Sequence, residues 1–184
     1  MSATATPTMA AAPAVTTGGD GAVRLSIFLG AAVIALMMVF GLLMRAAQGA
    51  WIEIDPALFY QLMTAHGAGM VGAAGLTGAT IMWHFTGRHV PLTPVVFTIF
   101  LGLFLLGVVL VLAGIFLGGY AGAWTFLFPL PAQSGGLWEP WAAVVFLLGY
   151  TSIGVAFLLL HLEVGRQIIA AWGGIGRALA WPLA

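Results

Sequence analysis

Four long apolar runs dominate the chain, and charged residues, prolines or glycines separate them. The runs are Leu25–Met44, Leu58–Phe85, Val95–Gly119 and Trp141–Leu162. Each reaches the roughly 20 residues that an α-helix needs to cross about 30 Å of hydrocarbon. The pattern therefore predicts an all-α, polytopic membrane protein with four transmembrane helices.

The sequence outside and between these runs suggests three parts. Residues 1–21 are rich in Ala, Thr, Pro and Gly, carry Asp20 as their charge, and are expected to form a disordered N-terminal tail. Residues 22–172 form the four-helix domain. Residues 173–184 contain Arg177 and Trp181 and suit an interfacial segment better than a fifth span.

The arginines predict the direction in which the helices cross the membrane. With the N-terminus inside, Arg24, Arg88, Arg166 and Arg177 lie on the cytoplasmic side and Arg45 lies outside. Cytoplasmic ends of membrane helices carry an excess of basic residues, so we expect an N-in/C-in chain in the inner (cytoplasmic) membrane.

Composition narrows the class and the chemistry. The hydrophobic fraction is 62% and the charged fraction 5%, with a mean hydropathy of +1.12, more apolar surface than a soluble domain could bury. Five basic residues balance five acidic ones, which argues against a nucleic-acid partner. The absence of cysteine excludes thiolate metal sites and iron–sulfur clusters, so a metal would need His, Met, carboxylate or backbone ligands.

The second apolar run is unusual because it combines many glycines with a histidine, His66. Small residues in a membrane helix let another helix, or a flat ligand, approach the backbone closely. Ala65, Gly69 and Ala73 could therefore be a helix-packing stripe. Alternatively, Gly69 and Ala73 leave a flat cleft beside the imidazole for a macrocycle.

His66 lies about eight residues, or about 12 Å, from the outer end of its predicted helix. An ionisable residue at such a depth is a functional-site hypothesis. The imidazole could hydrogen-bond a neighbouring helix, or it could ligate haem iron through one ring nitrogen while the other finds an oxygen partner. Met70 shares this face and is expected to pack there, because two ligands on one helix cannot occupy opposite sides of one haem.

Two segments together resemble a known family. Gly41–Arg45 followed by Phe59–Met70 is similar to the first two helices of the haem–copper oxidase catalytic subunit, subunit I of cytochrome c and quinol oxidases. In that family the Thr-Ala-His-Gly-x-x-Met signature supplies one axial ligand of the low-spin haem. The resemblance implies that His66 is this ligand and that Arg45 contacts the edge of the haem.

The likeness is weaker elsewhere in the chain. Ala123–Leu130 resembles the turn after the third helix of that family, and Leu159–Leu162 resembles part of its fourth helix. The glycine-rich run that closes the family's second helix is replaced here by Ile81–Phe85, and Glu163 stands where the family usually has a small residue. Only the signature around His66 is specific.

The resemblance also implies what lies outside this sequence. The copper-binding histidines, the high-spin haem ligand and the second low-spin ligand belong to later helices of the family, so copper is not expected here and the chain is not expected to reduce oxygen alone. We therefore expect a split or truncated component of a respiratory terminal oxidase. It would serve electron transport with one ligand to a low-spin haem of a or b type, and other oxidase subunits would be its partners.

Two alternatives remain open. The chain could be a cofactor-free structural subunit, or a homodimer that shares one b-type haem between two copies of His66. His84 and His161 could ligate a second, inner haem, or they could simply contact lipid headgroups. Glu163 and Arg166 are three residues apart, which predicts an ion pair, although Glu163 beside His161 could also carry protons.

Overall fold

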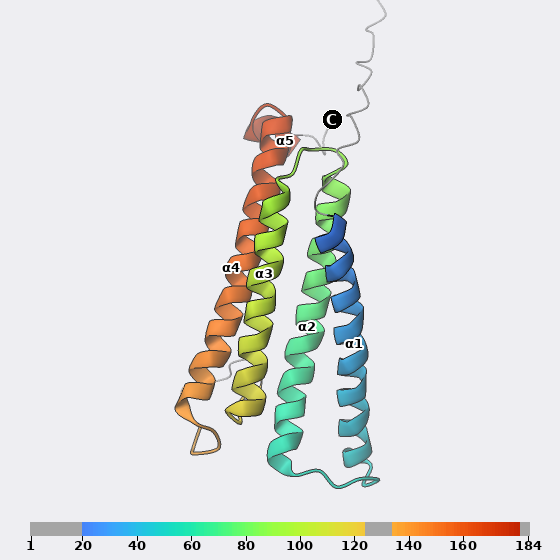
Figure 1. Ribbon diagram of the computed structural model, residues 1–184, viewed down its shortest axis with the longest axis vertical. Coiled ribbons are helices and arrows are strands. Elements are labelled where there is room, and N and C mark those ends of the chain that lie inside the picture. The colour runs from blue at the N-terminus through green and yellow to red at the C-terminus, as the bar shows by residue number, and fades with distance from the viewer. Residues whose placement is uncertain (1–19, 124–133, 181–184) are drawn as a thin grey trace, which may run out of the picture.

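The computed structural model describes residues 20–123 and 134–180, and these residues are all-α, with no strand among them. Four long helices run alternately up and down the molecule (Figure 1). The elements are α1 (Asp20–Gln48), α2 (Pro56–Thr86), α3 (Pro94–Leu112), the π-helical turn η1 (Ala113–Leu117) that continues α3, α4 (Pro140–Ala171) and the short α5 (Ile175–Ala180).

Prolines and one cap define where the helices begin. Pro56, Pro94 and Pro140 are the first residues of α2, α3 and α4, where a missing N–H costs nothing and the fixed φ angle favours the helix. Asp55 caps α2, since its carboxylate accepts hydrogen bonds from the backbone N–H groups of Ala57 (2.9 Å) and Leu58 (3.3 Å). These signals explain why the predicted starts of the last three long helices are accurate to within two residues.

The predicted bounds of two helices are wrong by more than that. The first helix runs from Asp20 to Gln48, several residues beyond both ends of the apolar run Leu25–Met44. The fourth helix continues past Leu162 to Ala171. Apolar length underestimates both helices, because backbone hydrogen bonding continues through polar residues such as Arg45 and Gln167, which are good helix formers.

Among the described helices, three are long and apolar enough to cross a membrane: Gly21–Gln48, Pro94–Leu117 and Pro140–Ala171. The chain is therefore a helical membrane protein. Helix α2 is 31 residues long but does not meet the same criterion, because its glycines, threonines and histidines lower its hydropathy.

The long helices form two close antiparallel pairs, α1 with α2 and α3 with α4 (Figure 1). In the first pair, a Cβ at Gly30 would lie 3.0 Å from the Thr77 Cγ2 atom, and the buried hydroxyls of Ser26 and Thr80 are 2.9 Å apart. Small and hydroxyl side chains thus bring α1 and α2 together, as is typical of helices in lipid.

The second pair is closer still. A Cβ at Gly107 would lie 2.6 Å from the Gly149 carbonyl oxygen, and a Cβ at Gly149 would lie 2.7 Å from the Gly107 oxygen. Ser152 donates a 2.8 Å hydrogen bond to the Leu103 carbonyl oxygen across the same interface. Helices α3 and α4 therefore touch backbone to backbone.

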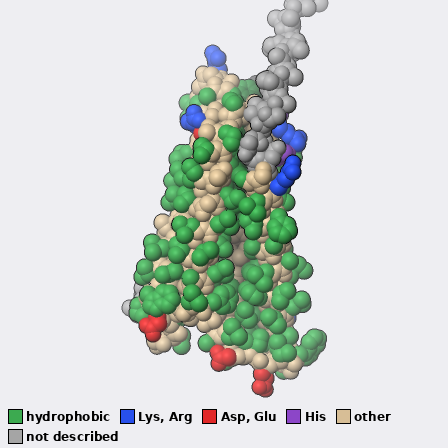
Figure 2. Space-filling model, in the orientation of Figure 1, with side chains coloured by type: hydrophobic (Ala, Val, Ile, Leu, Met, Phe, Trp, Pro, Cys, Tyr) green, Lys and Arg blue, Asp and Glu red, His purple; other side chains and the backbone are tan. Residues whose placement is uncertain are grey.

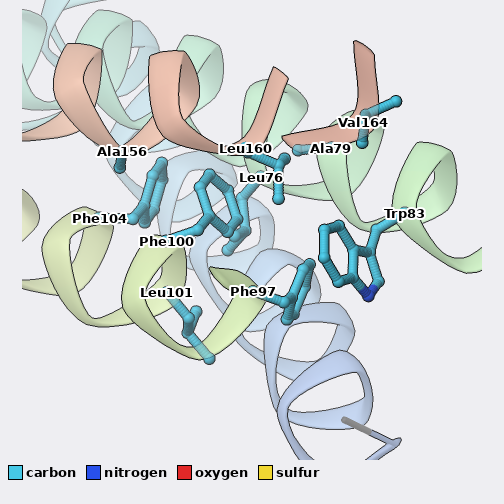
Figure 3. Close-up of a cluster of buried hydrophobic side chains, with 10 residues drawn as sticks. All are labelled: Leu76, Ala79, Trp83, Phe97, Phe100, Leu101, Phe104, Ala156, Leu160 and Val164. Carbon is cyan, nitrogen blue, oxygen red and sulfur yellow. The ribbon is translucent and has the colours of Figure 1, made fainter. Parts of the chain in front are cut away.

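An aromatic cluster joins the two pairs near the end of α2 (Figure 3). Trp83 of α2 packs against Phe97 of α3 with ring centroids 5.2 Å apart, and Phe100 contacts Phe157 of α4 at 5.4 Å. The buried members are Leu76, Ala79, Trp83, Phe97, Phe100, Leu101, Phe104, Ala156, Leu160 and Val164. A second cluster lies at the opposite end, where Tyr120 stacks on Phe146 at 4.2 Å.

Charge is divided between the two ends of the bundle. Acidic side chains gather at the end where α2 and α4 begin, and arginines gather at the end that carries α5 (Figure 2). Asp55 and Glu139 cap the first of these ends, and Arg177 belongs to α5. Of the segment Ala123–Leu130, which resembles a turn of the oxidase family, residues 124–130 lie outside the described residues.

Candidate cofactor site at His66

His66 is partly buried on α2, and its ring is hydrogen-bonded to the neighbouring helix. Its Nδ1 atom lies 2.7 Å from the backbone carbonyl oxygen of Met37 on α1. A carbonyl oxygen only accepts hydrogen bonds, so Nδ1 carries the proton and Nε2 of the neutral ring keeps its lone pair. This is the tautomer in which a histidine can bind a metal through Nε2.

Gly41 makes this approach possible. A Cβ at this position would lie 3.2 Å from the His66 Cε1 atom, tighter than ordinary van der Waals contact. In the sequence, Gly41 stands out only as part of the segment Gly41–Arg45. Gly41 can be recognised as the residue that makes room for the His66 ring only after α1 and α2 are paired antiparallel, because it then lies opposite that ring.

A cavity of about 590 Å³ lies beside the imidazole, between α1 and the first turns of α2. Its lining residues are Met38, Gly41, Leu42, Met44, Arg45, Gln48, Phe59, Met63 and His66. The volume falls within the usual range for small-molecule and cofactor sites. The structure therefore brings together His66 and Arg45, the two residues that the sequence paired from separate helices.

The polar groups of the cavity are few and identifiable. Arg45 donates a 3.1 Å hydrogen bond to Gln48, and no carboxylate of the described residues forms an ion pair with it. Its guanidinium can therefore meet an acidic group of a ligand. The remaining lining is mainly methionine, leucine and phenylalanine, which suits a flat apolar body; methionine in particular adapts its shape to what it contacts.

Gly69, Met70 and Ala73 lie outside this cavity. A Cβ at Gly69 would lie 2.9 Å from the Met37 Cγ atom, so Met37 already fills the space of the flat cleft, which was one of the two alternatives for this stripe. Ala73 is 2% exposed within the protein, and Met70 is 40% exposed on its surface. The small-residue stripe is a helix-packing surface here, and the open space lies on another side of His66.

His84 and His161 each bond a residue four positions away in the chain. Nε2 of His84 lies 2.9 Å from Nη2 of Arg88, and Nδ1 of His161 lies 2.7 Å from the Phe157 carbonyl oxygen. The described residues contain no group of three or more His, Cys, Asp or Glu side chains placed to hold a metal ion. An inner haem shared by His84 and His161 gains no support from these contacts.

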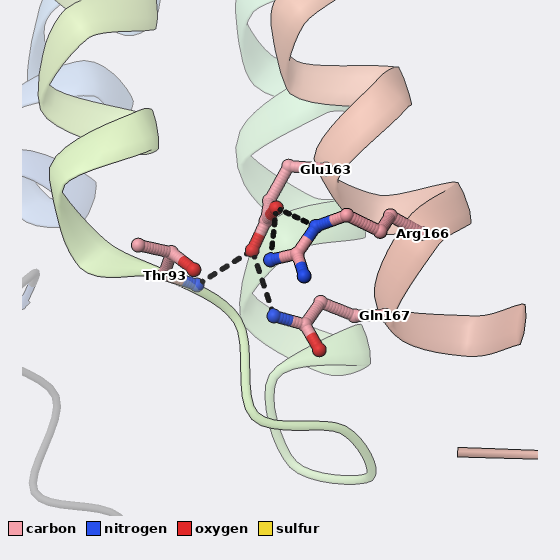
Figure 4. Close-up of polar contacts among 4 residues, drawn as sticks. All are labelled: Thr93, Glu163, Arg166 and Gln167. Atoms are coloured by element: carbon pink, nitrogen blue, oxygen red, sulfur yellow. Dashed lines mark hydrogen bonds and ion pairs between the residues drawn. The ribbon is translucent and has the colours of Figure 1, made fainter. Parts of the chain in front are cut away.

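Glu163 is buried and fully hydrogen-bonded (Figure 4). It accepts two hydrogen bonds from Arg166, at 2.9 and 2.8 Å, which confirms the predicted ion pair. It also accepts from Gln167 at 2.9 Å and from the backbone N–H of Thr93 at 3.0 Å. Since Thr93 immediately precedes α3, this carboxylate ties α4 to the connection between α2 and α3.

Comparison of the chain with protein-family models, with curated proteins and with solved structures finds no match.

Proposed function

We propose that the chain is a component of a respiratory terminal oxidase in which His66 supplies one axial ligand of a low-spin haem. The observation that carries the proposal is the Nδ1 hydrogen bond to Met37 O (2.7 Å) in a ring that lines a cavity of about 590 Å³. The bond holds the ring and leaves Nε2 as the nitrogen available to iron.

The residues around the cavity fit such a group. His66 offers one imidazole nitrogen, Arg45 offers a cation for an acidic substituent, and the methionines and Phe59 offer an apolar surface. When bound, a haem would supply a one-electron redox centre. The second axial ligand would come from helices outside this sequence, or from His66 of a second copy.

The chain's own residues have defined tasks at this site. Met37 fixes the orientation of the imidazole and, by accepting the Nδ1 proton in a hydrogen bond, raises the basicity of Nε2. Gly41 keeps the ring edge free of steric conflict. Arg45 places a positive charge in the lining, and a nearby positive charge favours the reduced, less positive state of an iron centre.

The proposal includes four spans with both ends of the chain inside. Helix α2 is bound to α1 near one end of the pair, through Ser26 and Thr80, and near the middle, through Met37 and His66, so it would cross with α1. The arginine-rich end would face the cytoplasm, and the His66 cavity would then lie in the outer half of an inner membrane.

Because the chain has no cysteine, single cysteines can test this topology. Glu53→Cys is expected to react with an impermeant maleimide in intact cells, whereas Leu179→Cys is expected to react only after the membrane is permeabilised. Both positions are exposed. The reverse labelling pattern would contradict the orientation.

Haem binding at His66 can be tested by optical spectroscopy of the chain, purified from native membranes together with the proteins that copurify with it. We expect a reduced-minus-oxidised haem band in the wild type that is lost in His66→Ala and kept in His161→Ala. His161 is the matched control because its Nδ1 also bonds a backbone carbonyl oxygen, at 2.7 Å. Absence of haem from the native wild-type preparation, or an unchanged band in His66→Ala, would overturn the proposal.

The same hydrogen bond favours a second candidate function, a cofactor-free structural subunit. The His66–Met37 contact joins α1 to α2 without any ligand, and interhelical hydrogen bonds in membranes contribute about 0.6 kcal/mol on average. In this case the wild type would contain no haem, and His66→Ala would lower the free energy of unfolding by about that amount.

A further inference from the structure

A second cavity lies at the arginine-rich end of the α1–α2 pair, far along both helices from His66. Its volume is about 380 Å³. The lining residues are Val23, Arg24, Ile27, Thr80, Ile81, His84 and Phe85. The haem proposal uses none of them.

Hydrogen-bond donors concentrate at this cavity. Nη2 of Arg88 lies 2.9 Å from Nε2 of His84; since a guanidinium only donates, Nε2 accepts and Nδ1–H stays available as a donor. The Arg88 Cζ atom also lies 5.0 Å from the centroid of the Phe85 ring, which holds the guanidinium over a residue of the cavity lining. Arg24 itself lines the cavity.

These charges have no acidic partner among the described side chains. The ion pair found there joins Arg166 to Glu163 on α4, and no carboxylate among these described side chains lines the cavity or bonds Arg24 or Arg88. The basic side chains at this end are visible at the surface (Figure 2). A ligand here would need a negative charge.

The rest of the cavity is apolar and faces outward. Ile27 is 50% exposed, Ile81 is 54% exposed and Phe85 is 54% exposed. In a membrane these side chains would contact lipid acyl chains, and the arginines would lie at the level of the headgroups. One end of the cavity is thus cationic and continues into an apolar surface, which matches an anionic amphiphile and not a free anion.

We propose that this cavity binds an anionic phospholipid. Arg24, Arg88 and the Nδ1–H of His84 receive the headgroup phosphate, and the acyl chain lies along Ile27 and Ile81. Basic pockets between membrane helices on the cytoplasmic side bind such headgroups, and each arginine near the membrane surface contributes roughly a five-fold gain in binding.

Native mass spectrometry of the full chain in detergent tests the site, with dioleoyl phosphatidylglycerol as the probe. Dioleoyl phosphatidylcholine is the zwitterionic comparison, and inorganic phosphate is the comparison without acyl chains. We expect the wild type to retain phosphatidylglycerol preferentially, and the double variant R24Q/R88Q to lose roughly 25-fold of that preference.

Two further variants keep the result interpretable. R24K/R88K preserves both charges and is expected to retain most of the preference. R177Q removes an exposed arginine of α5 at the same end and is expected to behave as the wild type.

Equal retention of the two lipids by the wild type would overturn the proposal. So would an equal loss in R177Q, or binding of inorganic phosphate as tight as that of phosphatidylglycerol. The haem band of R24Q/R88Q is expected to match the wild type, so failure of the lipid site and failure of the haem site are distinguishable.

Discussion

Replacing Gly149 by alanine tests the backbone contact between α3 and α4. The added Cβ would lie 2.7 Å from the Gly107 carbonyl oxygen and 2.9 Å from the Val111 backbone nitrogen. Both neighbours are backbone atoms, which cannot rotate away as the end of a flexible side chain could. Helices α3 and α4 must therefore separate locally.

The size of the effect follows from that geometry. Ordinary van der Waals contact begins at 3.4 Å, so the Cβ lies about 0.7 Å too close to the Gly107 oxygen. Overpacking of this kind costs about 1–3 kcal/mol, and separation would also strain the hydrogen bond from Ser152 to the Leu103 carbonyl oxygen (2.8 Å). Against this, alanine gains about 1 kcal/mol over glycine in helix propensity.

Gly154→Ala is the matched control. Gly154 belongs to the same helix, and a Cβ there would meet no atom within 4 Å. It gains the same helix propensity without overpacking, so the difference between the two variants isolates the contact. We expect Gly149→Ala to have a free energy of unfolding about 2 kcal/mol lower than Gly154→Ala.

Unfolding of the purified chain by SDS in mixed micelles, followed by circular dichroism, measures this difference. Equal midpoints for Gly149→Ala and Gly154→Ala would refute the backbone contact between α3 and α4. A lower midpoint in both variants would instead show that the helix itself, not the contact, determines the response.

Three further substitutions test other contacts by the same unfolding assay. Glu163→Gln is expected to lower the free energy of unfolding by about 2 kcal/mol, because Arg166 and the Thr93 N–H lose a charged acceptor. Glu139 is exposed and makes no side-chain cap bond, so Glu139→Gln is the control and should have little effect. Equal effects of the two substitutions would argue that Glu163 does not anchor α4. Gly69→Leu is expected to lower the free energy of unfolding by at least about 2 kcal/mol, because Met37 fills the adjacent space. Gly78→Leu on the same helix is the control, since a Cβ there meets open space. Equal stability of the two variants would contradict the packing of Met37 against Gly69. Asp55→Ala is expected to lower the free energy of unfolding by about 1 kcal/mol, because it removes the N-cap of α2. Glu53→Ala, at an exposed position before that cap, is the control and should lower it by less. Equal effects would mean that the cap makes no measurable contribution to stability.

Local patterns in the sequence determined the helices. Apolar runs of spanning length predicted four long helices, and three of these runs begin within two residues of the observed helix starts at Pro56, Pro94 and Pro140, because helix formation depends on near neighbours in the chain. The Glu163–Arg166 pair was predictable for the same reason, since residues three apart share one face of a helix.

The environment of His66 depended on the pairing of two helices. The family resemblance associated His66 with Arg45, and the sequence left open whether Gly69 and Ala73 form a packing stripe or leave a cleft for a ligand. In the structure Met37 fills that position and the cavity opens beside Gly41. A hydrophobic run has no strong periodicity that would show which face meets its neighbour, so the register of α1 against α2 could not be deduced.

The sequence by itself therefore determined that this is a helical membrane protein with one conspicuous histidine in its second helix. Only the tertiary structure decided which ring nitrogen of that histidine is engaged and where a ligand has room. The physical reason is that the Met37 carbonyl oxygen and the glycine opposite the ring lie 29 and 25 residues away along the chain. Their contact with His66 exists only once α1 and α2 are packed together.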